Sequence, residues 1–297
     1  MSSQLNTPAA AGTDLVLSVR NLTVDYAVHR TSFRAVEDVS FDVPRGSTVA
    51  IVGESGCGKS TIAKAIVRLL TPTSGEILVN GQDIARMPAR QLRPLRAKVQ
   101  MVFQDPYGSL DPHLTAEDIV AEPLTLRGIR SGKERRAEAA KLIDQVGLPA
   151  SALGRRPAEF SGGQRQRIGI ARALASKPEL LVCDEATSAL DVSVQAQVLE
   201  LLADIQRDSG LTYLMISHNL GVVRESSSHV LVMSKGKIVE QGPTEQVLTR
   251  PQDPYTRALR AAALDPLTMT GRKPREVVSR LNKVALQGEP VLMEEAS

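Results

Sequence analysis

The octapeptide Gly53–Ser60, with the sequence GESGCGKS, constrains the fold of this chain more than any other segment. It fits the pattern G-x-x-x-x-G-K-[ST] and lies between an apolar run, Ser47–Val52, and a helical stretch, Lys59–Leu70, which is the context that the pattern requires. Its glycines let successive backbone N–H groups point inward at phosphate oxygens, and the helix N-terminus adds positive partial charge. The segment predicts a nucleoside-triphosphate site in which Lys59 reaches the β- and γ-phosphates and the Ser60 hydroxyl ligates Mg²⁺.

Apolar strand-like segments alternate with helical ones along most of the chain, which is typical of layered α/β proteins. Ser47–Val52 and Leu180–Cys183 are continuous apolar runs, as expected for strands buried in a mainly parallel core sheet. Leu15–Ala27 alternates apolar and polar residues and, with Ala35–Val43, is expected to form an N-terminal antiparallel β layer. Further strands are expected at Glu76–Val79, Lys98–Phe103, Thr212–Ser217, Val230–Ser234 and Lys237–Glu240, the last two joined through Gly236 as a hairpin, and helices at Lys133–Val146 and Ser193–Asp208.

The alternation is interrupted at about residues 105–177, where mostly helical patterns predict an inserted helical subdomain. Residues 1–13 have little to bury and are expected to form a disordered tail. The expected division is therefore this tail, one folded domain at 14–264 that includes the helical subdomain, and a polar C-terminal extension at 265–297.

The composition excludes several classes of protein. Hydrophobic residues make up 42% of the 297 residues, which is enough for a sizeable core. The charges sum to 36 − 33 = +3, too little to indicate nucleic-acid binding, and the low aromatic content disfavours a binder that stacks bases. No apolar run approaches the roughly 18 residues of a membrane helix, and the N-terminus lacks the features of a signal peptide, so we expect a cytoplasmic chain. Cys57 and Cys183 are too few for a disulfide framework or metal cluster.

Two further segments carry chemistry. The run Leu180–Glu185 ends in two carboxylates, which point into the ligand crevice when they lie at the carboxyl edge of a parallel sheet. Asp184 is then placed to hold Mg²⁺, and Glu185 to polarise an attacking water. Ser161–Gln164, SGGQ, precedes a helical, arginine-rich stretch and predicts a second anion site at a helix start, although SGG alone is more often a plain helix cap.

The order of these segments resembles the ATP-binding subunits of ABC transporters, over about residues 14–264. The SGGQ segment lies 23 residues before Asp184 (184 − 161), and this combination separates such ATPases from other P-loop proteins. The motifs that carry the resemblance are, in order, Gly53–Ser60, Gln104, Ser161–Gln164, Asp184-Glu185, Ser188–Asp191 and His218. The resemblance implies an ABC-type P-loop ATPase fold with ATP and Mg²⁺ as ligands.

Finer segments resemble the oligopeptide/dipeptide importer branch: Gln104–Pro112, Phe160–Arg167, Ser188–Val194 and Asp253–Leu259. Three positions depart from the branch pattern, because Asp253 replaces a histidine, Ala186 a proline and Asn219 an aspartate, but none removes a catalytic group. The segment after Gly288-Glu289-Pro290 lacks the cysteines that many members carry, so no iron–sulfur cluster is expected there.

The resemblance also implies a role for each matching residue in a head-to-tail dimer that sandwiches two ATP molecules. Glu185 acts as general base, His218 contacts the γ-phosphate and orients the water, and Asp191 serves communication across the dimer. Ser161, Gly162, Gly163 and Gln164 complete the partner's site rather than their own. Gln104 and Lys59 have further catalytic roles by the same resemblance, and Ser60, Gln104 and Asp184 bind the metal ion. The implied nucleotide-binding residues are Tyr26, Gly53, Glu54, Ser55, Gly56, Cys57, Gly58, Lys59, Ser60, Thr61 and Gln104.

The sequence suggests a further interpretation for two of these residues. Tyr26 matches the position that stacks on adenine, but a strand-end tyrosine also packs on its neighbours. Cys57 lies within the phosphate loop, and the hypothesis is that a bulky group on its thiol blocks nucleotide binding.

The function implied is that of an ATP-hydrolysing motor of an importer, with peptides as the leading cargo and nickel or glutathione-like cargo as alternatives. A soluble, non-transport ABC ATPase is disfavoured because no long coiled coil, zinc cysteines or second cassette appears. An ordinary P-loop kinase would not need Ser161–Gln164 or His218, and a module that binds without hydrolysing would not need Glu185.

The implied partners are separate membrane permease subunits, which dock near Asp105–Pro123, and a second ATPase subunit, either the same chain or a related one. An extracytoplasmic substrate-binding protein is an indirect partner, and the expected location is the cytoplasmic face of the cell membrane. No nucleic-acid partner is expected, because the basic run Arg165, Arg167 and Arg172 is better explained as solvated or paired.

Overall fold

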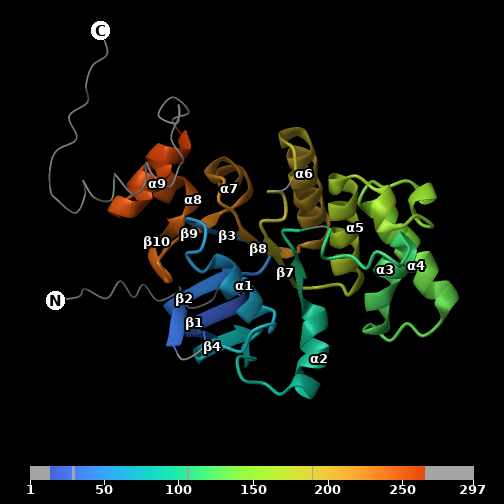
Figure 1. Cartoon of the computed structure of the whole chain (residues 1–297), viewed down its shortest axis with the longest axis horizontal. Coiled ribbons are helices and arrows are strands. Elements are labelled where there is room, and N and C mark those ends of the chain that lie inside the picture. The colour runs from blue at the N-terminus through green and yellow to red at the C-terminus, as the bar shows by residue number, and fades with distance from the viewer. Residues whose placement is uncertain (1–13, 29–30, 106, 189, 265–297) are drawn as a thin grey trace, which may run out of the picture.

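The computed structural model describes residues 14–28, 31–105, 107–188 and 190–264. The expected tail at 1–13 and the extension at 265–297 lie outside the described residues. Within the described part, two sheets lie against each other with one helix between them, and a helical lobe lies at one end of the molecule (Figure 1). The elements agree with an α/β fold that combines a mainly parallel sheet, an antiparallel sheet and inserted helices.

The central sheet has six strands in the order β10-β9-β3-β8-β7-β6. Its five neighbouring strands from β9 to β6 pair in parallel, and only β10 at one edge is antiparallel. Strands β3, β7 and β8 are buried along their whole length, as their continuous apolar sequences predict. The strands are β3 (Thr48–Val52), β6 (Val99–Val102), β7 (Leu180–Asp184), β8 (Thr212–Ile216), β9 (His229–Ser234) and β10 (Lys237–Pro243).

The second sheet has four antiparallel strands in the order β2-β1-β4-β5. Its members are β1 (Leu15–Val28), β2 (Thr31–Pro44), β4 (Ser74–Val79) and β5 (Gln82–Asp83). The register of β1 shifts between Val19 and Leu22, where Asn21 has a left-handed φ of 47°. This irregularity interrupts the regular pairing of β1 with β2.

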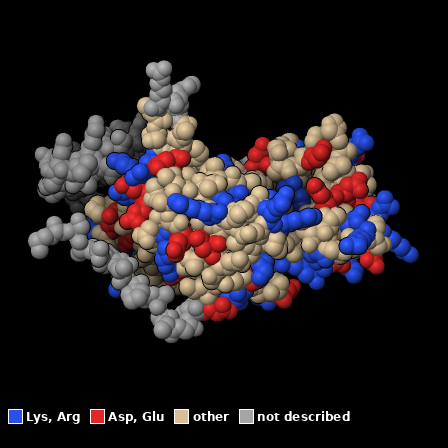
Figure 2. Space-filling model, turned by 90° about the horizontal axis from the view of Figure 1, so that it is seen from below, with Lys and Arg blue, Asp and Glu red and all other residues tan. Residues whose placement is uncertain are grey.

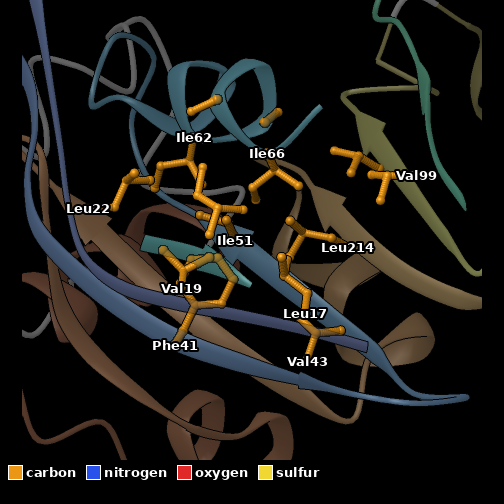
Figure 3. Packing of buried hydrophobic residues seen from close by; sticks show 14 of the residues in the cluster. Leu17, Val19, Leu22, Phe41, Val43, Ile51, Ile62, Ile66, Val99 and Leu214 are labelled. Atoms are coloured by element: carbon orange, nitrogen blue, oxygen red, sulfur yellow. The ribbon is translucent and has the colours of Figure 1, made fainter. Parts of the chain in front are cut away.

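Helix α1 (Lys59–Ile66) lies between the two sheets and packs on both. Ile62 and Ile66 of α1 contact a cluster that includes Leu17 of β1, Phe41 of β2 and Ile51 of β3 (Figure 3). The helix is shorter than the expected Lys59–Leu70, because Arg68 adopts a left-handed φ of 57° and the N–H groups of Leu69 and Leu70 both donate to the Lys64 carbonyl. This is a common way for helices to end.

Successive side chains of the parallel strands point to opposite faces of the central sheet. On the face away from α1, they contribute to two further apolar cores. Ala50 and Val52 of β3 face a cluster with α7 (Leu220–Ser226), α8 (Thr244–Thr249) and α9 (Pro254–Leu264). Leu181 and Cys183 of β7 face a cluster with the helical lobe and α6 (Val192–Ser209). Each of these strands therefore packs apolar side chains on both faces of the sheet. A shift by one residue would exchange the two sets of side chains, so the packing fixes the register of the strand.

The helical lobe lies at one end of the molecule, between β6 and β7 in the chain (Figure 1). Its three main helices pack on one another and bury Ile119, Ile143 and Ile168 completely or nearly so. They are α3 (Ala116–Ala121), α4 (Gly132–Gln145) and α5 (Gly162–Ala175), joined by short 3₁₀ turns at Glu122–Thr125, Ala150–Ala152 and Pro157–Glu159. The position of this lobe agrees with the helical insertion expected at about 105–177.

Several elements were not expected from the sequence. Helix α2 (Ala89–Lys98) contains Pro94 and buries only Leu92 and Leu95, so its pattern is weak. Helices α7 and α8 are short, and α9 ends at the last described residue, Leu264. Their apolar residues form one face only when they pack against the sheet, so the sequence alone does not show a helical pattern. In the described part of the chain, no helix combines the length and hydropathy needed to cross a bilayer.

A network of ion pairs joins the two sheets at the edge opposite the phosphate loop. The Glu179 carboxylate, just before β7, accepts from Arg45 Nη1 at 2.8 Å and lies 3.2 Å from Lys98 Nζ. Asn80 Nδ2 also donates to it at 3.1 Å. Partial burial raises the pKa of Glu179, but the hydrogen bonds from Arg45 and Lys98 outweigh that effect, so the net shift of the pKa is downward.

We expect Glu179→Gln to lower the free energy of unfolding at pH 7 by about 1 kcal/mol or less, because the network is partly exposed. A carboxyl whose folded-state pKa is lowered stabilises the fold above its unfolded pKa and loses this effect as the pH falls through the folded pKa. Urea unfolding of both proteins at pH 7 and in the acid range measures the difference. It should be largest at pH 7 and shrink on acidification, and an increasing difference in acid would contradict the assignment.

Candidate functional site

The phosphate loop Gly53–Ser60 lies between β3 and α1, pressed against strands of both sheets. A Cβ atom at Gly53 would lie 2.1 Å from the carbonyl oxygen of Met233, at the end of β9. At Gly58, which has a left-handed φ of 109°, it would lie 2.4 Å from the carbonyl oxygen of Ala35 in β2. These two glycines are therefore required for close packing as well as for the curl of the loop.

Lys59 lies inside the loop, where its side chain is almost completely buried. Its ammonium group donates to the carbonyl oxygens of Gly53 and Glu54, both at 2.8 Å. Its contacts are with uncharged groups, these two carbonyls and Cys57 Sγ at 3.9 Å, so the buried ammonium is an energetically favourable site for an anion. The loop thus presents one positive charge and the N-terminus of α1 to the same point.

Ser60 and Asp184 come together from the ends of α1 and β7. The Ser60 hydroxyl donates to Asp184 Oδ1 at 2.8 Å. Burial raises the pKa of Asp184, against the opposing effects of the Ser60 hydrogen bond and of Lys59 and Lys64, and the nearby Glu185 raises it further. A hydroxyl and a carboxylate oxygen at this distance form an oxygen donor pair of the kind that Mg²⁺ prefers.

Three side chains from different strand ends meet directly beside this pair. Gln104, after β6, donates through Nε2 to Glu185 Oε2 at 3.0 Å. His218, after β8, has its Nδ1 3.4 Å from the same Glu185 oxygen. Glu185 itself has a left-handed φ of 47°, an unfavourable conformation for a non-glycine residue that is typical of functional sites. The structure therefore brings together Gln104, Glu185 and His218, three of the four residues to which the resemblance gives catalytic roles.

Tyr26 also lies near the phosphate loop. Its hydroxyl is 3.3 Å from the Thr61 hydroxyl in the first turn of α1. The ring belongs to β1 and is half-buried, so it combines packing on the loop with an accessible surface.

The signature segment Ser161–Gln164 begins α5 in the helical lobe. Ser161 caps the helix, because its Oγ accepts from the Gln164 N–H at 3.3 Å while Gln164 Oε1 accepts from the Ser161 N–H at 3.1 Å. Among the described residues, no hydrogen bond or ion pair links this segment to the phosphate loop of the same chain. The structure thus forms the signature as a separate helix start.

Gly163 of the signature packs closely against α6. A Cβ atom there would lie 2.3 Å from Cγ1 of Val194. Asp191 caps the same helix α6 by accepting from the Val194 N–H at 2.9 Å and from the Ser193 hydroxyl, and these hydrogen bonds lower its pKa. The signature and Asp191 are therefore linked through the first turn of α6.

The arginines that follow the signature are paired inside the helical lobe, as expected. Arg165 donates to the Pro157 carbonyl, Arg167 to the Val146 carbonyl and Arg172 to the Ser109 carbonyl, at distances of 2.6 to 2.7 Å. Figure 2 shows basic and acidic side chains mixed over the face seen from below. Neither observation indicates a nucleic-acid interface.

Two contacts near the site were not predicted from the sequence. Tyr107, shortly after Gln104, stacks on the Arg165 guanidinium at 3.8 Å from the ring centroid. Tyr255 of α9 lies against the phosphate loop, and its hydroxyl accepts from the Glu54 N–H at 3.1 Å. Both are tertiary contacts between distant segments, and the only sequence signal for them was the resemblance of their segments to the peptide importer branch.

The site geometry agrees with what comparisons with known proteins find. A profile of the ABC transporter family matches residues 36–188. The chain is 50% identical over 257 residues to a probable peptide ABC transporter ATP-binding protein, y4tS, of Sinorhizobium fredii. This alignment covers 84% of this chain and 73% of that protein. It is 46% identical to the oligopeptide transport ATP-binding protein OppF of Bacillus subtilis, over 84% of this chain and 83% of that one. The chain belongs to the ABC transporter family, as one of its ATP-binding subunits.

The fold of this ABC subunit is also found in solved cassettes. The dimeric post-hydrolysis state of the ATP-binding cassette MJ0796, bound to ADP and Pi, superimposes with a TM-score of 0.71 at 31% identity. The superposition covers 77% of this chain and 98% of that cassette. The ABC-type P-loop ATPase fold and the ATPase activity expected from the sequence are confirmed, and the chain binds a nucleotide.

The close packing of Gly163 on α6 predicts that Gly163→Ala weakens ATP hydrolysis by this ABC subunit. The added methyl group forces α5 and α6 apart, because the β-branched Val194 has little rotamer freedom in a helix. We expect a loss of about 1–3 kcal/mol in the free energy of unfolding together with lower ATPase activity. Urea unfolding and steady-state hydrolysis measure the two effects.

Gly169→Ala is the matched control, because Gly169 lies on the same helix and a Cβ there would meet nothing within 4 Å. It should leave the protein as stable or more stable, since alanine favours helix over glycine by about 1 kcal/mol. Equal effects of the two substitutions would contradict the role of the Val194 contact.

The two cysteines should react with thiol reagents very slowly at neutral pH. Burial raises the pKa of the Cys57 thiol, against an opposing effect of Lys59, and raises that of Cys183 to about 12. Since the thiolate is the nucleophile, labelling of Cys57 in the folded protein should accelerate with increasing pH, and Cys183 should react only after unfolding. Mass spectrometry of tryptic peptides after timed labelling measures both rates. Once Cys57 is fully labelled, ATP affinity should be lost, and retained affinity would contradict its place in the nucleotide site.

Proposed function

We propose that this chain is the ATP-hydrolysing motor of a peptide importer, with the catalytic centre formed by Gln104, Glu185 and His218. The observation that carries this proposal is the convergence of Gln104 and His218 on one oxygen of Glu185, directly after Asp184, which is bonded to Ser60 of the phosphate loop. The names of the peptide transport relatives support the choice of cargo. The motor itself does not contact the cargo, so glutathione-like or nickel cargo remains the alternative.

The phosphate loop would bind the triphosphate. Lys59 exchanges its carbonyl contacts in the loop for β- and γ-phosphate oxygens, and the N–H groups of residues 56–61 donate to the phosphates. Tyr26 lies beside Thr61 at the loop and would stack on the adenine ring.

The residues present fit a magnesium ion. Ser60 Oγ and Asp184 Oδ1 are 2.8 Å apart, and the Gln104 amide, bonded to Glu185, provides a further oxygen donor nearby. These three residues would hold Mg²⁺, which supplies positive charge to the β- and γ-phosphate oxygens.

Glu185 would act as general base toward the attacking water. Its side chain is mostly buried and is fixed by Gln104 on one side and His218 on the other. The mostly exposed imidazole of His218 would contact the γ-phosphate and orient the water. Gln104 connects this centre to the helical lobe, because the chain runs from it directly into that lobe.

The signature Ser161–Gln164 would act on ATP bound to a second subunit. It is a preformed, capped helix start in the helical lobe and so offers N–H groups to an anion. Two such subunits arranged head to tail would enclose two ATP molecules, with the nucleotide stabilising the dimer. The partner is a second copy or a related chain. Closure and opening of this dimer would drive separate permease subunits, docked near Asp105–Pro123, which receive cargo from an extracytoplasmic binding protein at the membrane.

The test is ATP-dependent association of Glu185→Gln. This variant keeps the phosphate loop and the Mg²⁺ donors but lacks the base, so we expect it to bind ATP, to lose hydrolysis by at least about 100-fold and to accumulate as a dimer with ATP but not with ADP. Size-exclusion chromatography measures the dimer, with hydrolysis by the unmutated protein measured alongside.

Lys59→Ala is the matched control, because it should remain monomeric with either nucleotide. A Glu185→Gln protein that binds ATP but stays monomeric would point to a different chain as the second subunit or to a need for the membrane subunits in dimerisation. Normal hydrolysis by Glu185→Gln would contradict the proposed mechanism. In vesicles that contain the assembled transporter, ATP-dependent uptake of a labelled oligopeptide, and not of glutathione or Ni²⁺, would support the proposed cargo.

A further inference from the structure

The start of helix α9 lies against the phosphate loop, although the two are distant in sequence. The Tyr255 hydroxyl accepts a hydrogen bond from the Glu54 N–H at 3.1 Å. The tyrosine is 8% exposed and its ring packs in the apolar cluster with Ala50 and Val52 of β3, the strand that leads into the loop. A buried side chain from the C-terminal part of the domain thus contacts the second residue of the loop.

Tyr255 is held in place by the segment before it. Its own N–H donates to Asp253 Oδ1 at 2.7 Å. The Glu240 carboxylate of β10 accepts from the N–H groups of Gln252 and Asp253, at 2.8 and 3.1 Å. The position of the hydroxyl is therefore set by the antiparallel edge strand of the central sheet, and β10 and α9 lie next to each other in Figure 1.

The hairpin between β9 and β10 contacts the same loop a few residues further on. The Gly236 N–H donates to the Cys57 carbonyl at 3.0 Å, while the Gly236 carbonyl accepts from the Glu37 N–H of β2 at 2.8 Å. Burial raises the pKa of the Tyr255 hydroxyl, and the nearby Ser234 side chain at the end of β9 opposes this shift. The segment from Gly236 to Tyr255 thus holds the loop at both Glu54 and Cys57.

Glu54 is the point at which these contacts reach the phosphate-binding lysine. Its carbonyl oxygen accepts from Lys59 Nζ at 2.8 Å and from the Cys57 N–H at 3.3 Å, while its N–H is bonded to Tyr255. A shift of this residue moves a contact of Lys59 directly.

We propose that Tyr255 is a positioning residue for nucleotide binding, whose hydroxyl fixes Glu54 and so sets the phosphate loop in the conformation that receives the phosphates. This proposal rests on the nucleotide site of the proposed function. In this proposal, α9 holds the phosphate loop in its binding conformation through Glu54, and Tyr255 does not contact the nucleotide itself.

The hydroxyl remains protonated throughout the physiological range. Burial raises the pKa of Tyr255 to about 12, against an opposing effect of the Glu54 hydrogen bond. The group therefore accepts from Glu54 and keeps a proton of its own to donate, and nucleotide binding should not show a pH dependence from Tyr255 between pH 6 and 9.

The test is Tyr255→Phe, which keeps the ring and removes the hydroxyl. The Glu54 N–H then loses its partner, and we expect the Kd for ATP to rise about 5- to 10-fold. Because Tyr255 acts on the loop and not on the γ-phosphate, the Kd for ADP should rise by the same factor. The kcat at saturating ATP should stay within about twofold of the unmutated protein while KM rises, since the catalytic group is untouched. Fluorescence titration with ribose-labelled ATP and ADP and steady-state hydrolysis measure these quantities.

Tyr213→Phe is the matched control. Tyr213 of β8 is also buried. Its hydroxyl donates to the Leu202 carbonyl of α6 at 2.8 Å, and this hydrogen bond does not involve the phosphate loop. It should lower the free energy of unfolding as much as Tyr255→Phe or more, yet leave both Kd values unchanged. If both variants weaken nucleotide binding equally, the effect of Tyr255 is one of general stability and the proposal is overturned.

Ser234→Ala gives a second, independent measurement that does not alter the tyrosine. It removes the neighbouring side chain that acts on the Tyr255 hydroxyl and should raise the Kd by a smaller factor, with no further rise when it is added to Tyr255→Phe. Additive effects would overturn the proposal, as would an unchanged Kd in Tyr255→Phe when the unmutated protein binds ATP. Failure of the unmutated protein to bind ATP would instead contradict the proposed function.

Discussion

The close contact of the phosphate loop with two strands is the constraint on which the rest of the structure depends. Gly53 lies under the Met233 carbonyl and Gly58 under the Ala35 carbonyl, at distances that no side chain would allow. Met233 belongs to the parallel sheet and Ala35 to the antiparallel sheet, so the loop is packed between the two. The conformation of the loop therefore depends on contacts with both sheets, so the site of the buried Lys59 depends on the packing of the whole domain.

The parallel order of the central strands then decides which side chains meet. Strands β6, β7 and β8 are neighbours and point the same way, so the residues that follow them lie at one edge, as in other open α/β sheets. Gln104, Glu185 and His218 follow these strands, and Gln104 donates to the same Glu185 oxygen that lies 3.4 Å from His218 Nδ1. Their separation in the chain is large, but their separation in space is fixed by the spacing of the strands.

The features that the sequence predicts best are those encoded by local chemistry. The phosphate loop, the buried strands and the carboxylates after Leu180–Cys183 each carry a pattern within about ten residues. Helices α8 and α9 carry no such pattern, because Val247 and Tyr255 become an apolar face only against β3 and β9. The left-handed φ of Glu185 and the contact between Tyr255 and Glu54 depend on tertiary packing, and no local property of either segment indicates them.

The helical lobe shows how a change at the nucleotide could reach the rest of the molecule. Gln104 is bonded to Glu185 at the site, and Tyr107, three residues later, stacks on Arg165 of the signature helix. Arg165 is buried and anchored on the Pro157 carbonyl, so it moves only with the lobe. A displacement of Gln104 would therefore act on α5 as a whole, and Gly163 at the start of α5 would transmit it to α6 through Val194. Packed helices transmit such movements as rigid units because their contacts leave no free volume to absorb them.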